Sequence, residues 1–180
     1  MSGHSKWSQI KHKKGITDKK RAVLFSKLLA AISAAARTEP NPEYNPRLRS
    51  AIDTAREAQV PQDNVERAIK RSADAGELEE LLFEAYGPGG VAIFMTAITN
   101  SRNRTVNEIK HLLSIAGGKW AETGSVTWAF EPLEKETGVE WQAKFPQEIT
   151  LEDRAKLEVL LEALDEHPDI QEIYTNAEME

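Results

Sequence analysis

A dense run of basic residues lies near the start of the chain and could bind a polyanion. Sixteen residues contain seven cations and a single acid: Lys6, Lys11, Lys13, Lys14, Lys19, Lys20 and Arg21, with Asp18. Phosphate backbones bind dense positive charge that releases counterions, and Trp7 offers a flat face for stacking on a base, with His12 close by. The segment therefore predicts nucleic-acid binding. The alternative is a solvated charge run that only keeps the protein soluble.

The charge of the whole chain is divided unevenly between its two parts. The formal net charge is −6, but residues 1–71 carry +8 and residues 72–180 carry −14. Because charges are screened over about 8 Å at physiological salt, a ligand at one end hardly senses the other. This asymmetry is typical of a basic binding module joined to an acidic body.

Further cations lie on predicted helices. Lys27 and Arg49, on the first and second helices, join the predicted binding residues, and Arg102 and Arg104 stand beside a helix N-terminus where they could hold a phosphate. The alternative for Arg102 and Arg104 is a solvent-exposed loop. A third-helix cluster (Arg67, Lys70 and Arg71) follows Asp63 and Glu66 at ion-pair spacing, so ordinary surface pairs explain part of it.

Residues for catalysis or metal binding are not found at recognisable spacing. The chain has no cysteine, which excludes disulfides, a zinc ribbon and a thiol nucleophile. The turn Gly87–Gly90 lacks the Gly-Lys-Ser/Thr of a P-loop, and Ser125 precedes its strand rather than following it. His111 and His167 have no partner at ligand spacing. We therefore expect a protein that is not an enzyme and needs no cofactor or metal.

Residues 1–76 predict a basic segment followed by a three-helix bundle. Thr17 or Asp18 caps a first helix that ends near Arg37, and Asn45-Pro46 begins a second that ends at Val60-Pro61. A third helix is expected over 62–73. Their narrow, alanine-rich apolar stripes favour close packing.

Residues 77–180 predict an acidic α/β domain, giving an α+β fold class overall. Strands are expected at 81–86, 91–99, 125–130, 139–145 and 170–174, with helices near 106–116 and after Thr150. From Val91 onward the order is β-α-β-β-α-β, a ferredoxin-like arrangement with one extra hairpin strand before it.

Several motifs resemble the YebC/PmpR family, in the same order from residue 3 to residue 178. They include Gly3-His4-Ser5-Lys6-Trp7, Asn45-Pro46-Arg47-Leu48-Arg49, Tyr86-Gly87-Pro88-Gly89-Gly90, Arg102-Asn103-Arg104-Thr105, Gly124-Ser125-Val126 with Trp128, and Tyr174-Thr175-Asn176-Ala177-Glu178. The resemblance implies a helical N-terminal domain, α/β domains and no catalytic activity. Family members are described as DNA-binding transcriptional regulators, as a mitochondrial translational activator and as ribosome-associated proteins.

The sequence departs from the family pattern at one point. Members normally carry an additional α/β domain after the strand that corresponds to 125–130, and here residues 131–138 take its place. Any function that needs the inserted domain is therefore in doubt, whereas the basic motif is retained.

Three functions remain open. The first is a translation factor that contacts ribosomal RNA, with the ribosome as a possible partner, through Lys6–Arg21 and the first helix. The second is a transcriptional regulator on duplex DNA. The short, alanine-rich helices offer few base-reading side chains, which favours RNA. The third is an adaptor whose acidic domain contacts a basic protein. The chain shows neither a membrane span nor a secretory signal, so we expect a cytoplasmic protein.

Overall fold

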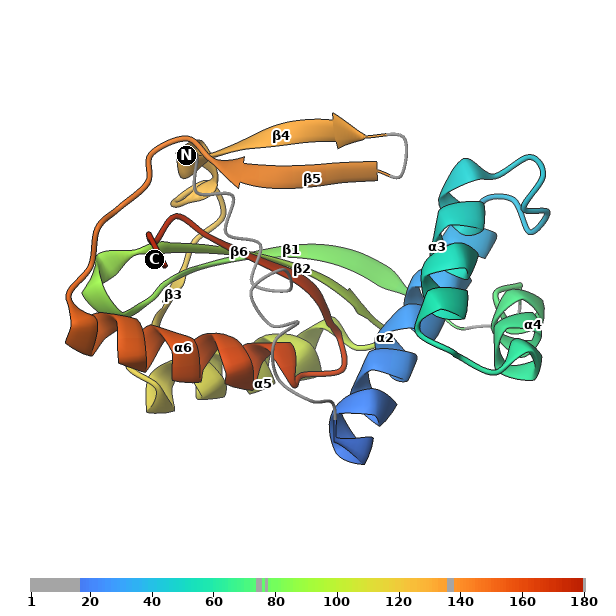
Figure 1. Cartoon of the computed structure of the whole chain (residues 1–180), viewed down its shortest axis with the longest axis horizontal. Coiled ribbons are helices and arrows are strands. Elements are labelled where there is room, and N and C mark those ends of the chain that lie inside the picture. Colours follow the sequence, from blue (N-terminus) through green and yellow to red (C-terminus); the bar gives the residue numbers. More distant parts are fainter. Residues whose placement is uncertain (1–16, 74–75, 77, 136–137, 180) are drawn as a thin grey trace.

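The first three described helices form a small bundle at one end of the molecule. In the computed structural model, which describes residues 17–73, 76, 78–135 and 138–179, they are α2 (Asp18–Ala36), α3 (Pro46–Glu57) and α4 (Gln62–Arg71) (Figure 1). The predicted caps are confirmed, because the side chains of Thr17 and Asn45 accept hydrogen bonds from the backbone N–H groups of Lys20 and Leu48. The apolar stripes meet in one core: Ile32, Ala35, Leu48, Ala55 and Val65.

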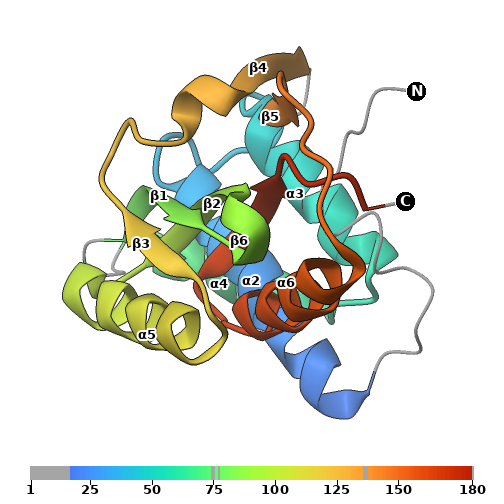
Figure 2. The same ribbon diagram turned by 90° about the vertical axis from the view of Figure 1, so that its left-hand side faces the viewer.

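A four-stranded antiparallel sheet forms the centre of the rest of the chain. Its strands are β1 (Glu79–Tyr86), β2 (Ala92–Thr99), β3 (Lys119–Ala121) and β6 (Ile170–Thr175), in the order β3-β1-β2-β6. Two helices, α5 (Arg102–Ile115) and α6 (Leu151–Asp165), cover one face (Figure 2). Alternate residues of β1 and β2 point into this layer, where Phe83, Ile93 and Met95 pack with Leu113 and Leu160.

The opposite face of the sheet is covered by a separate hairpin. It consists of β4 (Phe130–Lys135) and β5 (Gly138–Ala143), preceded by the 3-10 turn η3 (Thr127–Ala129). Aromatic rings fill this second core, because Phe94 of β2 lies 4.8 Å from Trp141, 5.8 Å from Phe130 and 6.3 Å from Tyr174 between ring centroids. None of the described helices combines the length and the apolar composition that a bilayer span requires.

The α+β class is confirmed, but the strand connectivity differs from the ferredoxin-like expectation. The predicted strands 125–130 and 139–145 do not join the main sheet. The first contains the turn η3 and shares only Phe130 with β4, which pairs with β5 in a separate two-stranded sheet. β1, expected as an extra strand, lies between β3 and β2. The short turn through η2 (Pro88–Gly90) lets β1 and β2 pair along their whole length. β3 pairs with the other edge of β1, which places β1 inside the sheet.

Gly118 joins α5 to β3 where the chain passes close to its neighbours. A Cβ at this position would lie 2.9 Å from Leu113 Cδ2, 3.0 Å from Leu160 Cδ2 and 3.2 Å from the Tyr86 carbonyl oxygen. Leucine tips can shift, but the backbone oxygen of a central strand cannot. We expect Gly118→Ala to lower the free energy of unfolding by about 1–3 kcal/mol in urea titrations.

Gly76→Ala is the matched control for Gly118→Ala. An added Cβ at Gly76 meets no atom within 4 Å, so this variant is expected to unfold like the parent protein. Equal unfolding midpoints for the two variants would contradict the close approach at Gly118.

Candidate nucleic-acid interface

The first turn of α2 carries the part of the basic segment that the structure describes. Lys19 and Arg21 are exposed there, and the Arg21 guanidinium lies 3.7 Å from the fully exposed carboxylate of Asp18. An exposed pair of this kind is weak, so a phosphate could replace Asp18 as its partner. The helix N-terminus adds a partial positive charge at the same place. The other predicted residues, Lys6, Trp7, Lys11, His12, Lys13 and Lys14, lie outside the described residues.

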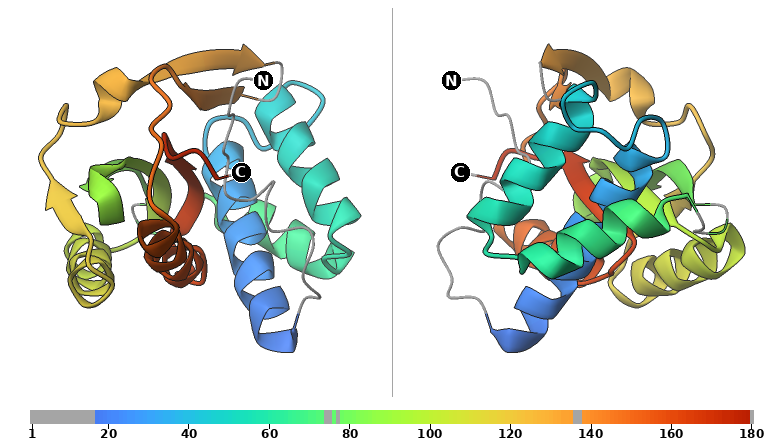
Figure 3. Two further views of the ribbon diagram at one scale, coloured as in Figure 1. Left: turned by 60° about the vertical axis from the view of Figure 1, so that its left-hand side comes forward. Right: turned by 90° about the vertical axis from the view of Figure 1, so that its right-hand side faces the viewer.

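Lys20 and Lys27, seven residues apart on one face of α2, join α2 to α6. The Lys20 ammonium lies 2.6 Å from Glu162 and 3.6 Å from Glu166. The hydrogen bond to Glu162 raises the pKa of the Lys20 ammonium above its ordinary value. α2 also contacts β2 and β6, and it lies between the sheet and α3 (Figure 3).

Lys27 is buried, with 7% of its surface exposed. Its ammonium donates to the Asp165 backbone oxygen at 2.5 Å and to Oδ1 of the same residue at 3.2 Å. A phosphate would have to displace these partners. We therefore assign Lys27 to the contact between α2 and α6, here called the α2–α6 joint, and leave it out of the proposed interface.

The other three predicted arginines lie on α3 and α5, and all have partners within the chain. Arg49, on α3, donates to the Pro42 carbonyl oxygen at 3.3 Å and remains exposed. Arg102 stands 3.9 Å from Glu79, whereas Arg104 donates to Asp169 at 2.6 Å. The predicted phosphate site at the start of α5 would therefore compete with carboxylates of the chain itself.

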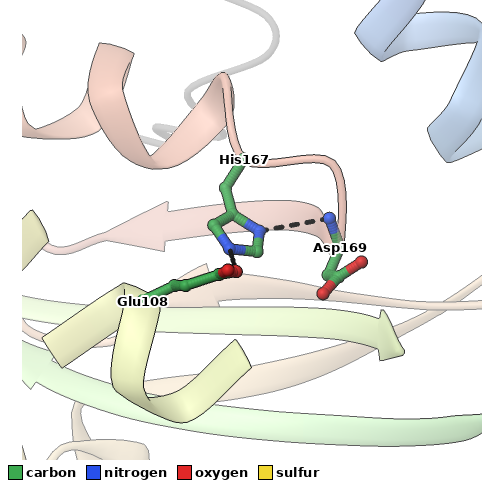
Figure 4. A group of neighbouring side chains, drawn as sticks. All are labelled: Glu108, His167 and Asp169. Carbon is green, nitrogen blue, oxygen red and sulfur yellow. Dashed lines mark hydrogen bonds and ion pairs between the residues drawn. The ribbon is translucent and has the colours of Figure 1, made fainter. Parts of the chain in front are cut away.

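His167 has partners that sequence spacing did not reveal. It is buried in the turn between α6 and β6, where its Nε2 lies 2.8 Å from Glu108 of α5 and its Nδ1 accepts from the Asp169 backbone N–H at 3.2 Å (Figure 4). Because Nδ1 accepts, the ring proton stands on Nε2 and is donated to Glu108.

Glu108, His167 and Asp169 offer three atoms within 4.8 Å of one another, a spacing that could suit a metal ion. However, Asp169 already accepts from Arg104 and from the Thr105 hydroxyl, both at 2.6 Å. A guanidinium beside the group opposes a second cation. The arrangement fits an internal hydrogen-bond network that ties α5 to the turn before β6.

Glu84 fixes the loop that leads into η3, and its role was not visible in the sequence. It lies on β1, only 4% exposed, on the face that the hairpin covers. Its carboxylate accepts from the backbone N–H groups of Gly124 and Val126, both at 2.6 Å, and of Thr127 at 3.0 Å; the Thr127 hydroxyl adds a fourth bond at 2.7 Å. Strand alternation cannot distinguish a covered second face from a solvated one.

Known proteins share both parts of this chain. The profile of the TACO1/YebC protein N-terminal domain matches residues 5–75, and that of the TACO1/YebC second and third domain matches residues 78–135. A probable transcriptional regulatory protein of Petrotoga mobilis is 43% identical over 182 residues, which cover 99% of this chain and 71% of the relative. The chain belongs to the TACO1/YebC family.

Other members of the TACO1/YebC family differ from this chain in length. A probable transcriptional regulatory protein of Solibacter usitatus is 49% identical over 147 residues, 76% of this chain but 59% of the relative. One from Pseudothermotoga lettingae, 36% identical, aligns over 242 positions and covers all of this chain and 95% of the relative. This chain is therefore shorter than these TACO1/YebC relatives, and the second profile match stops at the end of β4, where the departure was expected.

The fold also matches a solved structure. The crystal structure of the conserved hypothetical protein Aq1575 from Aquifex aeolicus superposes with a TM-score of 0.86 at 32% identity, covering 96% of each chain. The arrangement of the bundle, the sheet and the hairpin is thus a TACO1/YebC fold.

Proposed function

We propose that this chain is a nucleic-acid-binding regulator of gene expression that grips the sugar-phosphate backbone through Lys6–Arg21. One observation supports this most strongly: α6 engages only some of the cations of α2. Lys20 and Lys27 neutralise carboxylates of α6, whereas Lys19 and Arg21 stay exposed and continue the basic segment. Carboxylates of α6 therefore engage one face of α2, while Lys19 and Arg21 remain exposed to solvent and accessible to a phosphate.

A regulatory role agrees with the relatives, which are named probable transcriptional regulatory proteins. We favour contact with the backbone over reading of a specific operator. Two side chains of the bundle that could read base edges are engaged locally, because Arg56 pairs with Asp53 and Arg67 donates to Asn64. This favours RNA, including ribosomal RNA, as the target and translation as the process; duplex DNA is the alternative.

Cross-linking the full chain in cells and sequencing the attached nucleic acid distinguishes these targets. The test variant is Lys11→Glu/Lys13→Glu/Lys14→Glu. The control variant is Lys70→Glu/Lys110→Glu/Lys156→Glu, which changes the net charge equally at exposed positions elsewhere. Ribosomal RNA would support translation and promoter DNA would support transcription. No recovered nucleic acid, with full function after removal of residues 1–21, would contradict the proposal and favour a protein adaptor.

The salt dependence of binding gives a physical check. If about six phosphates are neutralised, the slope of log affinity against log salt should lie at about −4 to −6. Because each lost contact removes about 0.7–0.9 from the slope, the test variant should reduce its magnitude by about 2–3 and the control variant should not. Fluorescence anisotropy with a labelled oligonucleotide measures both slopes, and a flat response would exclude a backbone grip.

A further inference from the structure

Three aromatic side chains lie exposed beside one another on the side of the sheet that carries the hairpin. Tyr86 is 36% exposed, Trp128 62% and Phe145 53%. The rings of Trp128 and Phe145 lie 5.7 Å apart between centroids. Tyr86 and Trp128 meet at Ser125, because both donate to its carbonyl oxygen, at 3.2 Å and 2.7 Å. Exposed aromatic residues gathered at one place indicate an interaction site.

We call the surface formed by Tyr86, Trp128 and Phe145 the aromatic row. Hydrogen bonds within the chain hold it in position. Trp128 uses its only hydrogen-bond donor on Ser125, so that its ring plane is fixed and its face stays open. The loop that carries Ser125 and Trp128 is in turn fixed by Glu84 through the backbone N–H groups on either side of Ser125. A rigid, exposed indole has lost its side-chain freedom before any ligand arrives, which favours binding.

Two lysines flank the aromatic row. The Lys144 ammonium lies 5.6 Å from the Phe145 ring centroid, and Lys119 stands opposite Tyr86 in the β1–β3 register. Neither pairs with a carboxylate of the described residues, whereas Arg102, Arg104 and Lys156 of the same domain each do. Residues 72–180 carry a net charge of −14 and would repel a polyanion, whereas these two lysines would attract it locally.

We infer that the aromatic row stacks unpaired bases of a single-stranded nucleic acid, with Lys119 and Lys144 on the adjacent phosphates. Aromatic faces accept any base, and lysines follow the backbone, which is the chemistry of a single-strand binding surface. A basic protein partner would be opposed by the two lysines. This inference rests on the proposed nucleic-acid binding, and it adds a second contact surface that selects single strands over duplexes.

Binding of the full chain to a single-stranded RNA and to a duplex of the same length tests the inference. Trp128→Ala should weaken single-strand binding by about tenfold, in line with base–aromatic stacking, and leave duplex binding unchanged. Trp128→Phe should restore most of the affinity. In protein labelled with 5-fluorotryptophan, the ¹⁹F signal that Trp128→Phe removes should shift when the single strand is added.

The outcomes separate the aromatic row from the basic segment. If Trp128→Ala binds the single strand like the parent chain while Lys11→Glu/Lys13→Glu/Lys14→Glu loses both ligands, the aromatic row is not a binding surface and the proposed function stands. If the parent chain binds neither ligand, both proposals fail. Light scattering measures self-association. If Trp128→Ala loses self-association but keeps its RNA affinity, the aromatic row binds a second copy of the chain and the inference is wrong. Circular dichroism verifies that each variant is folded.

Discussion

Glu84→Gln is expected to lower the free energy of unfolding by about 3 kcal/mol, because buried hydrogen bonds to a charged group are strong and their loss leaves donors unsatisfied. The carboxylate accepts four hydrogen bonds through its two oxygens. A glutamine amide has a single acceptor oxygen, so its NH₂ group would face the backbone N–H of either Gly124 or Val126. Urea unfolding followed by circular dichroism measures the difference.

The pH dependence of the Glu84 effect has a defined sign. Burial raises the pKa of the Glu84 carboxyl, but the hydrogen bonds from Gly124, Thr127 and Val126 outweigh burial and hold the pKa below its ordinary value of 4.5. The charged form is therefore favoured in the folded chain. Its contribution to stability is complete above the unfolded-state pKa and is lost as the pH falls through the lower, folded-state value. The difference in the free energy of unfolding between the parent chain and Glu84→Gln should become smaller below about pH 4.5.

Glu122→Gln is the control for Glu84→Gln, because it removes an exposed carboxylate close to the same loop. It should change the free energy of unfolding by less than about 0.5 kcal/mol at any pH. If Glu84→Gln behaved like Glu122→Gln, Glu84 would not fix the loop, and the aromatic row above it would lose its support.

The helices could be predicted from the sequence because their signals are local. Asn45-Pro46 and Thr150 each cap the helix that they were expected to begin, and Gly117 has the positive φ of +75° expected just beyond a helix end. Each of these features depends only on residues within one or two turns of helix. The three-helix bundle followed from such signals.

The arrangement of strands could not be predicted in the same way because strand pairing joins distant residues. β3 has three residues, too few for a visible alternation, yet it forms one edge of the main sheet. The two strands of the β4–β5 hairpin have the composition of sheet strands, and nothing local shows that they pair with each other on top of the sheet instead of within it.

The roles of the predicted binding residues also depend on contacts between distant parts of the chain. A run of lysines near the N-terminus is visible in any sequence, but which of them face solvent depends on where α6 lies. Lys20 and Lys27 resemble Lys19 in type and position, and only the acidic end of α6 separates them. The sequence therefore showed the cluster of lysines but not that Lys20 and Lys27 pair with carboxylates of α6.

Lys27→Met is expected to lower the free energy of unfolding by about 3 kcal/mol, because removal of one partner from a buried ion pair leaves the other charge poorly solvated. The side chains of Lys27 and Asp165 are 9% and 16% exposed, so water cannot fully replace the ammonium. Lys19→Met, at an exposed position of the same helix, is the control and should have little effect. Thermal and urea unfolding measure both variants.

A double variant separates a structural role of Lys27 from a binding role. Lys27→Met/Asp165→Leu removes both charges from the α2–α6 joint and should recover at least about 1 kcal/mol relative to the sum of the single variants, because neither charge is left alone. If the α2–α6 joint is structural, this variant should also keep the nucleic-acid affinity of the parent chain. Additive destabilisation would contradict the ion pair between α2 and α6. Full stability combined with a large loss of affinity would return Lys27 to the nucleic-acid interface.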